Sequence, residues 1–277
     1  NHTNGGIIMN LEKIGGIIII LILILSIGLT VYSTTLNPTT TDNSSNKSVT
    51  NITLTENQLI DELSKNDTPT NISVVNLNIK QKTGSIDIKF ADSDNIYNIK
   101  SKNDANTKTD VTYTSNPDGS LDVNVNSKDA ENEIILSNKY TYNINGQIVS
   151  GAVITNSTAN SKINSMNFNN TLGAYVFDLN GGSINNVNVD LTLGGISIEG
   201  TPSGETTMTS TVTIGGVELD LNKDVANINS HIELGGSNIK NNPSNTEYIT
   251  YTSPNYDSSN DKFNLNNDIK IGGLNME

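Results

Sequence analysis

A motif of one aliphatic residue followed by two small residues, usually Gly-Gly, recurs in the second half of the chain and restricts its fold more than any other feature. The copies are Leu172-Gly173-Ala174, Leu193-Gly194-Gly195, Ile214-Gly215-Gly216, Leu234-Gly235-Gly236 and Ile271-Gly272-Gly273, at intervals of 21, 21, 20 and 37 residues. Apolar and polar residues alternate around each copy, as they do in β-strands. A unit of this length cannot bury its own apolar face, but stacked units can. The repeat therefore predicts an all-β fold with a single-stranded, right-handed parallel β-solenoid over residues 156–277, in coils of about 21 residues.

The alternation also predicts which side chains face the core of this solenoid. Leu193 and Ile214 are expected to point inward, one above the other, and each glycine pair is expected to form a corner that a Cβ would obstruct. The middle inward position is polar in three units, at Ser210, Ser230 and Asn267. We expect these side chains to form a ladder of hydrogen bonds between neighbouring coils.

The interval of 37 residues implies an insertion of about sixteen residues within the segment 241–261. This segment contains three tyrosines, Tyr248, Tyr251 and Tyr256. Long excursions from a rigid scaffold often carry binding sites, and an exposed Tyr is suited to stacking on a sugar or a partner. Two interpretations are open: the segment binds a surface glycan or protein, or it folds back as a loop or partial coil that caps the stack.

Residues 55–155 are expected to form a short helix and an antiparallel β region. Thr55 and Gln58 have the spacing of a capping box, which marks a helix start. Alternating segments then flank three turn sequences, Lys82-Thr83-Gly84, Asn116-Pro117-Asp118-Gly119 and Asn145-Gly146. Turns of this kind connect antiparallel strands, so we expect three hairpins.

Residues 14–32 form an apolar stretch of nineteen residues without a charge. As a helix this stretch would cross the ~30 Å hydrocarbon core of a membrane. We expect a transmembrane anchor that follows a cytoplasmic segment, 1–13, and precedes a flexible stalk rich in Thr, Ser and Asn, 33–54. The alternative is a cleaved signal peptide. Both interpretations place the polar remainder of the chain outside the cell, and the first makes the membrane a partner.

Composition excludes several classes of protein. The chain has 277 residues, a formal net charge of −13, no Cys, and only two histidines, His2 and His231. The acidic balance argues against a nucleic-acid partner, and the absence of Cys removes thiol nucleophiles and zinc thiolate ligands. A Ser-His-Asp triad would depend on His231 alone. We therefore expect no catalytic residue, no cofactor and no enzymatic activity.

One cluster of acidic residues nevertheless has the spacing of a possible site. The repeat register places Asp178, Glu199 and Asp220 in one outward column, with neighbours about 4.8 Å apart. Carboxylates at this spacing repel one another, share a proton or hold a cation. Three interpretations are open: a solvated acidic face, a weak divalent-cation site, or an acid pair like that of a retaining glycosidase, in which Glu199→Gln would abolish glycan hydrolysis.

The first half of the chain repeats a pattern, Gly-Ser-φ-Asp-φ with φ an apolar residue, at residues 84–88 and 119–123, ahead of the glycine repeats. Together these motifs, over residues 72–277, resemble the toast-rack and putative-adhesin (head GIN-type) domains and the C-terminal part of LiaF-type cell-wall-stress proteins. The resemblance implies a β-helical, non-enzymatic protein of the cell envelope. LiaF-type proteins have several membrane spans, whereas this chain has one candidate span.

The combined expectation is a membrane-anchored, surface-exposed β-solenoid that acts as a structural or adhesin-like interaction module. The alternative is a tethered sensor or regulator of cell-envelope stress. A glycan-active enzyme is a more distant third.

Overall fold

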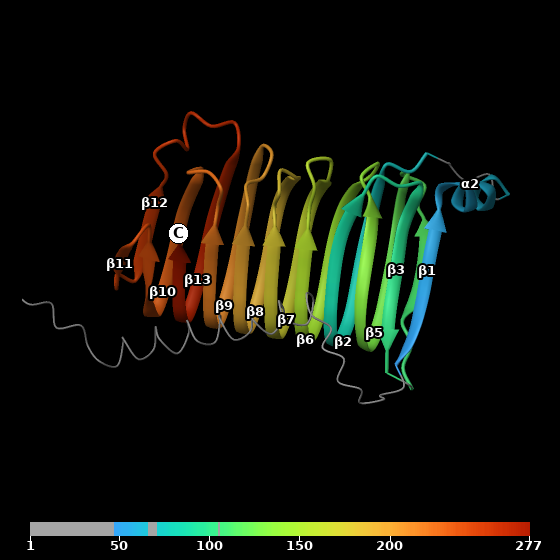
Figure 1. Ribbon diagram of the computed structural model, residues 1–277, viewed down its shortest axis with the longest axis horizontal. Coiled ribbons are helices and arrows are strands. Elements are labelled where there is room, and N and C mark those ends of the chain that lie inside the picture. The colour runs from blue at the N-terminus through green and yellow to red at the C-terminus, as the bar shows by residue number, and fades with distance from the viewer. Residues whose placement is uncertain (1–46, 66–70, 105) are drawn as a thin grey trace, which may run out of the picture.

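The computed structural model describes residues 47–65, 71–104 and 106–277, which form one helix and a single open sheet of thirteen strands (Figure 1). The strand order is β1-β3-β5-β2-β6-β7-β8-β9-β13-β10-β11, with β4 paired to β5 and β12 paired to β10. The described ranges contain no helix that is long and apolar enough to span a membrane. The predicted cytoplasmic segment, 1–13, and the predicted anchor, 14–32, lie outside the described residues.

Eight long strands run parallel to one another and form the centre of the sheet. In spatial order they are β5 (Ser120–Ser137), β2 (Val74–Ala91), β6 (Thr141–Asn156), β7 (Lys162–Asp178), β8 (Ser183–Glu199), β9 (Glu205–Asp220), β13 (Lys262–Met276) and β10 (Ala226–Ile239). Each strand aligns its small bend residue with that of its neighbour, as Gly194 does with Gly173 and Gly215. The repeat unit recognised in the sequence is therefore one long strand and its return loop.

The parallel arrangement begins at β2, so two of the three expected hairpins are wrong. Residues 82–84 lie inside β2 and residues 145–146 lie inside β6, and both strands pair in parallel with their neighbours. Gly84 lies at the bend of β2, where its φ is +111° and a Cβ would lie 1.9 Å from the backbone carbonyl oxygen of Ala130. Gly146 has a different reason: a Cβ at this position would lie 2.3 Å from a ring carbon of Phe168. In the sequence, a glycine that is required by close contact with a neighbouring strand cannot be distinguished from a glycine that is required by a turn.

The third expected hairpin is confirmed. Strand β4 (Asp110–Ser115) pairs antiparallel with the first part of β5, from Asp110 opposite Asn126 to Ser115 opposite Leu121. The amide of Gly119 donates a hydrogen bond to the carbonyl of Asn116 and closes the turn.

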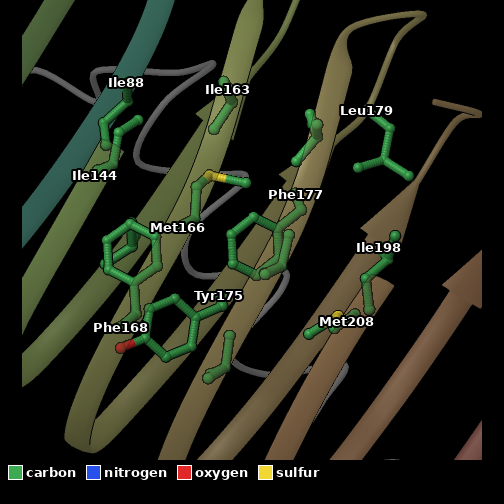
Figure 2. Packing of buried hydrophobic residues seen from close by; sticks show 14 of the residues in the cluster. Ile88, Ile144, Ile163, Met166, Phe168, Tyr175, Phe177, Leu179, Ile198 and Met208 are labelled. Atoms are coloured by element: carbon green, nitrogen blue, oxygen red, sulfur yellow. The ribbon is translucent and has the colours of Figure 1, made fainter. Parts of the chain in front are cut away.

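The long strands fold over at their aligned small bend residues, which are glycines in all of them except β5, where the residue is Ala130. The U-shaped ribbon beside Phe168 and Tyr175 shows one such bend (Figure 2). The inside–outside alternation breaks at this point, because Thr192 and Leu193 are both exposed whereas Gly194 and Gly195 are both buried. The aliphatic residue before each glycine is therefore on the outside of the bend. The expected inward positions of Leu193 and Ile214 are wrong, and both side chains are 40% exposed.

The bend glycines stack so closely that only hydrogen fits at the Cα. A Cβ on Gly215, whose φ is +151°, would lie 1.6 Å from the carbonyl oxygen of Gly194 in the next strand. Ala130 occupies the aligned position in β5, which is the last of the parallel strands. Here the next strand, β3, runs antiparallel. The predicted steric reason for the glycines is confirmed for the first glycine of each pair.

The C-terminal strand does not stack in chain order. Strand β13 lies between β9 and β10, so Ile271 lies between Ile214 and Leu234. The chain reaches this position after β11 (Asn242–Ser244) and β12 (Tyr248–Thr252) have paired antiparallel with the outer edge of β10. The segment 241–261 therefore folds back over the edge of the stack, as the capping interpretation predicts.

Short antiparallel strands and a helix cover the other end of the stack. Strand β3 (Asn95–Asn103) pairs with the second part of β5, and β1 (Ser48–Thr55) pairs with β3. The expectation that residues 48–54 belong to the flexible stalk is wrong. These residues form β1 because they hydrogen-bond to the edge of β3 that is not paired with β5. Helix α2 (Glu56–Ser64) follows at once and has the predicted Thr55–Gln58 capping box.

Two kinds of ladder connect the parallel strands besides the backbone. Inside, Ser210 donates a hydrogen bond to Asn267 (2.8 Å), and Asn267 donates one to Ser230 (2.9 Å), which confirms the predicted polar ladder. Outside, asparagine amides donate to the asparagine of the next strand in a column that runs through five strands, from Asn188 to Asn124; its members are Asn188, Asn167, Asn145, Asn78 and Asn124. Such amide ladders suit parallel, in-register strands.

Candidate interaction surfaces

The acidic column has the predicted register. Asp178 is aligned with Glu199, and Glu199 with Asp220, at the ends of β7, β8 and β9. Partial burial raises the pKa of Asp178. Partial burial, followed by the charges of Asp178 and Asp220, raises the pKa of Glu199. Of the three carboxylates, Glu199 in the middle therefore has its pKa raised by the charges of its two neighbours as well as by burial.

Within the described ranges, no group of three or more His, Cys, Asp or Glu side chains is close enough to hold a metal ion. The column thus has the charge for a cation but lacks converging ligands. The divalent-cation site and the glycosidase-like acid pair stay predictions from the sequence.

The three tyrosines of the segment 241–261 have different environments. Tyr251 is partly buried against the core, and the hydroxyl of Tyr256 donates a hydrogen bond to Asn264 at 2.6 Å while the Lys262 ammonium lies 4.9 Å from its ring centroid. Tyr248 is 71% exposed. Of the three, Tyr248 therefore offers the largest aromatic face to a ligand, and binding by any of them stays a prediction.

Tyr248 lies at the rim of an open groove of about 410 Å³ formed by β9, β13, β10 and β12. The groove is lined mainly by outward polar side chains, among them Thr209, Thr211, Asn229, Asn266 and Asp268. The ring of Tyr248 stacks on the imidazole of His231, with centroids 4.8 Å apart and planes inclined by 21°. An aromatic face beside hydroxyl, amide and carboxylate groups is suited to a polar ligand with an apolar face, such as a sugar.

His231, in β10, forms polar contacts with residues on both sides of its strand. Its Nδ1 lies 3.0 Å from Asp268 of β13, and its Nε2 lies 3.1 Å from Glu247 beside β12. Hydrogen bonds to Glu247 and Asp268, and then their charges, raise the pKa of this imidazole. A histidine between two carboxylates favours the protonated form, in which both ring nitrogens donate.

The sequence does not predict that His231, Glu247 and Asp268 contact one another. Asp268 lies 37 residues and Glu247 16 residues from His231 along the chain. The three meet because β13 inserts beside β10 and β12 pairs on its other side. The only available signal was the insertion of extra residues before the last repeat.

A search of solved structures finds a related fold. The chain is similar to the crystal structure of a "putative cell adhesion protein" from Clostridium sporogenes. The TM-score is 0.53 at 12% sequence identity, over 83% of this chain and 97% of that one. No protein-family model matches the sequence, and no curated protein matches it. At this identity the similarity establishes a shared fold, and neither the toast-rack nor the LiaF resemblance is confirmed by a family match.

Proposed function

We propose that this protein is a non-enzymatic, adhesin-like interaction module displayed at the cell surface, in which the parallel strands wind as a β-solenoid and residues 14–32 anchor the chain in the membrane. The fold shared with a protein described as a cell adhesion protein supports the adhesin-like role. The apolar length of residues 14–32 supports the anchor.

The observation that carries the proposal is the groove between Tyr248 and Asp268. Tyr248 in this groove is 71% exposed, although burial of a Tyr ring would be favourable. Its ring is held in one orientation by stacking on His231. A fixed aromatic face loses little conformational entropy when it binds. The polar groups around it come from strands of a continuous sheet, so they too are held in place. The proposed ligand is a surface glycan that stacks on Tyr248.

The test is binding of the purified full chain, in detergent, to an array of surface glycans and to isolated cell-wall polysaccharide. We expect Tyr248→Ala to reduce binding to the recognised glycan by about tenfold, because the stacking face is lost. Tyr248→Phe is the matched control, since it keeps the ring and should retain most of the binding. The ring stack with His231 is lost in the first variant only.

Equal binding by the wild type and Tyr248→Ala, with both correctly folded by circular dichroism, would exclude the groove as the binding surface. Absence of binding to every glycan and polysaccharide tested would contradict the proposed ligand class.

A further inference from the structure

The edge of the molecule where the long strands bend carries an exposed row of aliphatic side chains. These residues, here called the apolar row, lie on five adjacent strands and are each 40–54% exposed: Leu172, Leu193, Ile214, Ile271 and Leu234. At about 4.8 Å per strand the row is roughly 19 Å long. A contiguous apolar strip on an otherwise polar surface marks an interaction site.

A basic groove continues the bend edge beyond the apolar row. The groove, of about 670 Å³, is lined by four lysines and by no Asp or Glu. The lysines, here called the lysine group, are Lys80, Lys82, Lys108 and Lys128, and Val149, 53% exposed, lies between them and the row. None of the four forms an ion pair with another described residue. In a chain of net charge −13 this is a local excess of positive charge.

Charge is mixed at the far end of the row. Lys270 directly precedes Ile271, and Glu233 directly precedes Leu234. On β7, β8 and β9 the residue directly before the apolar-row residue is a threonine. The carboxylates of the acidic column lie at the strand ends, on the opposite side of the coil from the bends. The apolar row and the lysine group therefore lie at the bend edge, whereas the acidic column lies at the opposite edge.

The chain enters the folded body at this same edge. Ser48 begins β1 and pairs with Asn103, which pairs with Ala130 at the bend position of β5. Figure 1 shows β1 starting at the lower edge, where the long strands bend. Lys47, which directly precedes β1, forms an ion pair with Glu131, also at the bend. Only residues 33–46 separate this point from the apolar segment 14–32.

We propose that the bend edge lies against an anionic lipid membrane, with the apolar row at the level of the headgroups and the lysine group on acidic phosphates. This inference rests on the membrane anchor of the proposed function, which would bring the edge to the bilayer through a tether of fourteen residues. Aliphatic side chains beside lysines form the usual interfacial binding surface. The groove beside Tyr248 is open to solvent, since Tyr248 is 71% exposed, and it stays accessible in this orientation.

The test uses the full chain reconstituted into vesicles of phosphatidylcholine with phosphatidylglycerol. The sequence contains no Cys, so one introduced thiol can be labelled specifically. An environment-sensitive fluorophore is placed in the apolar row through L193C and, as the matched control, on an exposed return loop through S203C. We expect a blue shift and quenching by brominated lipid at position 193 and neither at position 203.

The lysine group gives a second measurement. Replacing Lys80, Lys82 and Lys128 by Glu should reduce quenching at position 193 at least threefold, and so should vesicles without the anionic lipid. Equal emission at positions 193 and 203 in anionic vesicles would overturn the proposal. A blue shift at position 193 that increases with protein density, without quenching by brominated lipid, would also overturn it. The apolar row would then pack against a second copy of the chain.

An alkaline carbonate wash separates this proposal from the anchor. Protein that stays in the vesicles without quenching at position 193 contradicts the bend-edge proposal and leaves the anchor intact. Protein that is quenched before the wash and removed by it supports the bend edge and contradicts the anchor.

Discussion

At the scale of single residues, the bend glycines decide whether adjacent strands can approach to hydrogen-bonding distance. Gly215→Ala would place a methyl group 1.6 Å from the carbonyl oxygen of Gly194, so one strand must move or the bend must open. We expect a loss of about 2–4 kcal/mol in the free energy of unfolding, measured by chemical denaturation. Gly204→Ala is the control: its φ is also positive, but no atom lies within 4 Å of the added Cβ, so the loss should be about 1 kcal/mol. Equal losses would show that steric contact between the bends is unimportant.

The inner polar ladder tests the cost of an unpaired buried group. Asn267→Ala leaves the hydroxyls of Ser210 and Ser230 without their shared partner. We expect a loss of about 1–3 kcal/mol. The triple variant Ser210→Ala, Asn267→Ala, Ser230→Ala should lose less per residue than the single one, because no unpaired polar group is then left in the core. A triple variant that loses the sum of three independent replacements would contradict this account.

His231 makes the stability of the C-terminal cap depend on pH. Its folded-state pKa is raised by Glu247 and Asp268, so its contribution is fully present below the unfolded-state pKa of about 6.5 and is lost as pH rises through the folded-state value. We expect the difference in Tm between the wild type and His231→Gln to be largest near pH 6 and smaller above pH 8. The C2–H signal in NMR that is absent from the His231→Gln variant belongs to His231 and should titrate above pH 6.5. A Tm difference that grows with pH would contradict the assignment.

At the scale of elements, the short strands and the helix protect the ends of a stack that would otherwise expose core and unpaired backbone groups. Strands β3 and β4 cover the two arms of β5, and β11 and β12 cover the two arms of β10. Helix α2 contributes the buried Leu59 and Leu63 to the core cluster.

Two neighbouring residues of α2 test the capping role. Leu59→Ala removes a buried side chain and should cost about 2–4 kcal/mol, measured by thermal or chemical unfolding. Ile60→Ala is the matched control, because Ile60 is exposed and its replacement should change stability by less than about 0.5 kcal/mol. Similar effects of the two replacements would show that α2 does not seal the stack.

At the scale of the whole molecule, the last strand completes the middle of the sheet. Strand β13 pairs with β9 on one side and with β10 on the other, so β10 has no parallel neighbour until the chain is complete. Removing residues 262–277 would leave a gap two strand spacings wide between β9 and β10. It would also remove the buried Phe263, Leu265 and Ile269 and expose the inward side chains of β9 and β10 beside them. We expect the truncated chain to lose hydrogen-exchange protection in β9 and β10 and to unfold without a single cooperative transition. Retained protection in β10 would show that this strand is stable without β13.

The sequence by itself determined the strand content, the register of β7 to β9, the helix start at Thr55, the β4–β5 turn and the inner ladder. These features depend on contacts between residues close in the chain or at one repeated spacing, so periodicity and turn chemistry are enough to predict them. The acidic column follows from the same spacing.

Only the tertiary structure decided where strands go when they leave chain order. Gly84 and Gly146 have the local chemistry of turns, yet both lie within continuous strands because neighbouring strands supply their hydrogen bonds. Leu193 is exposed because of the bend in its strand. The insertion of β13 and the contact between His231 and Asp268 depend on strand pairing between segments that are distant in the sequence. The free energy of such pairings comes from groups that are not neighbours in the sequence, so no local pattern records them.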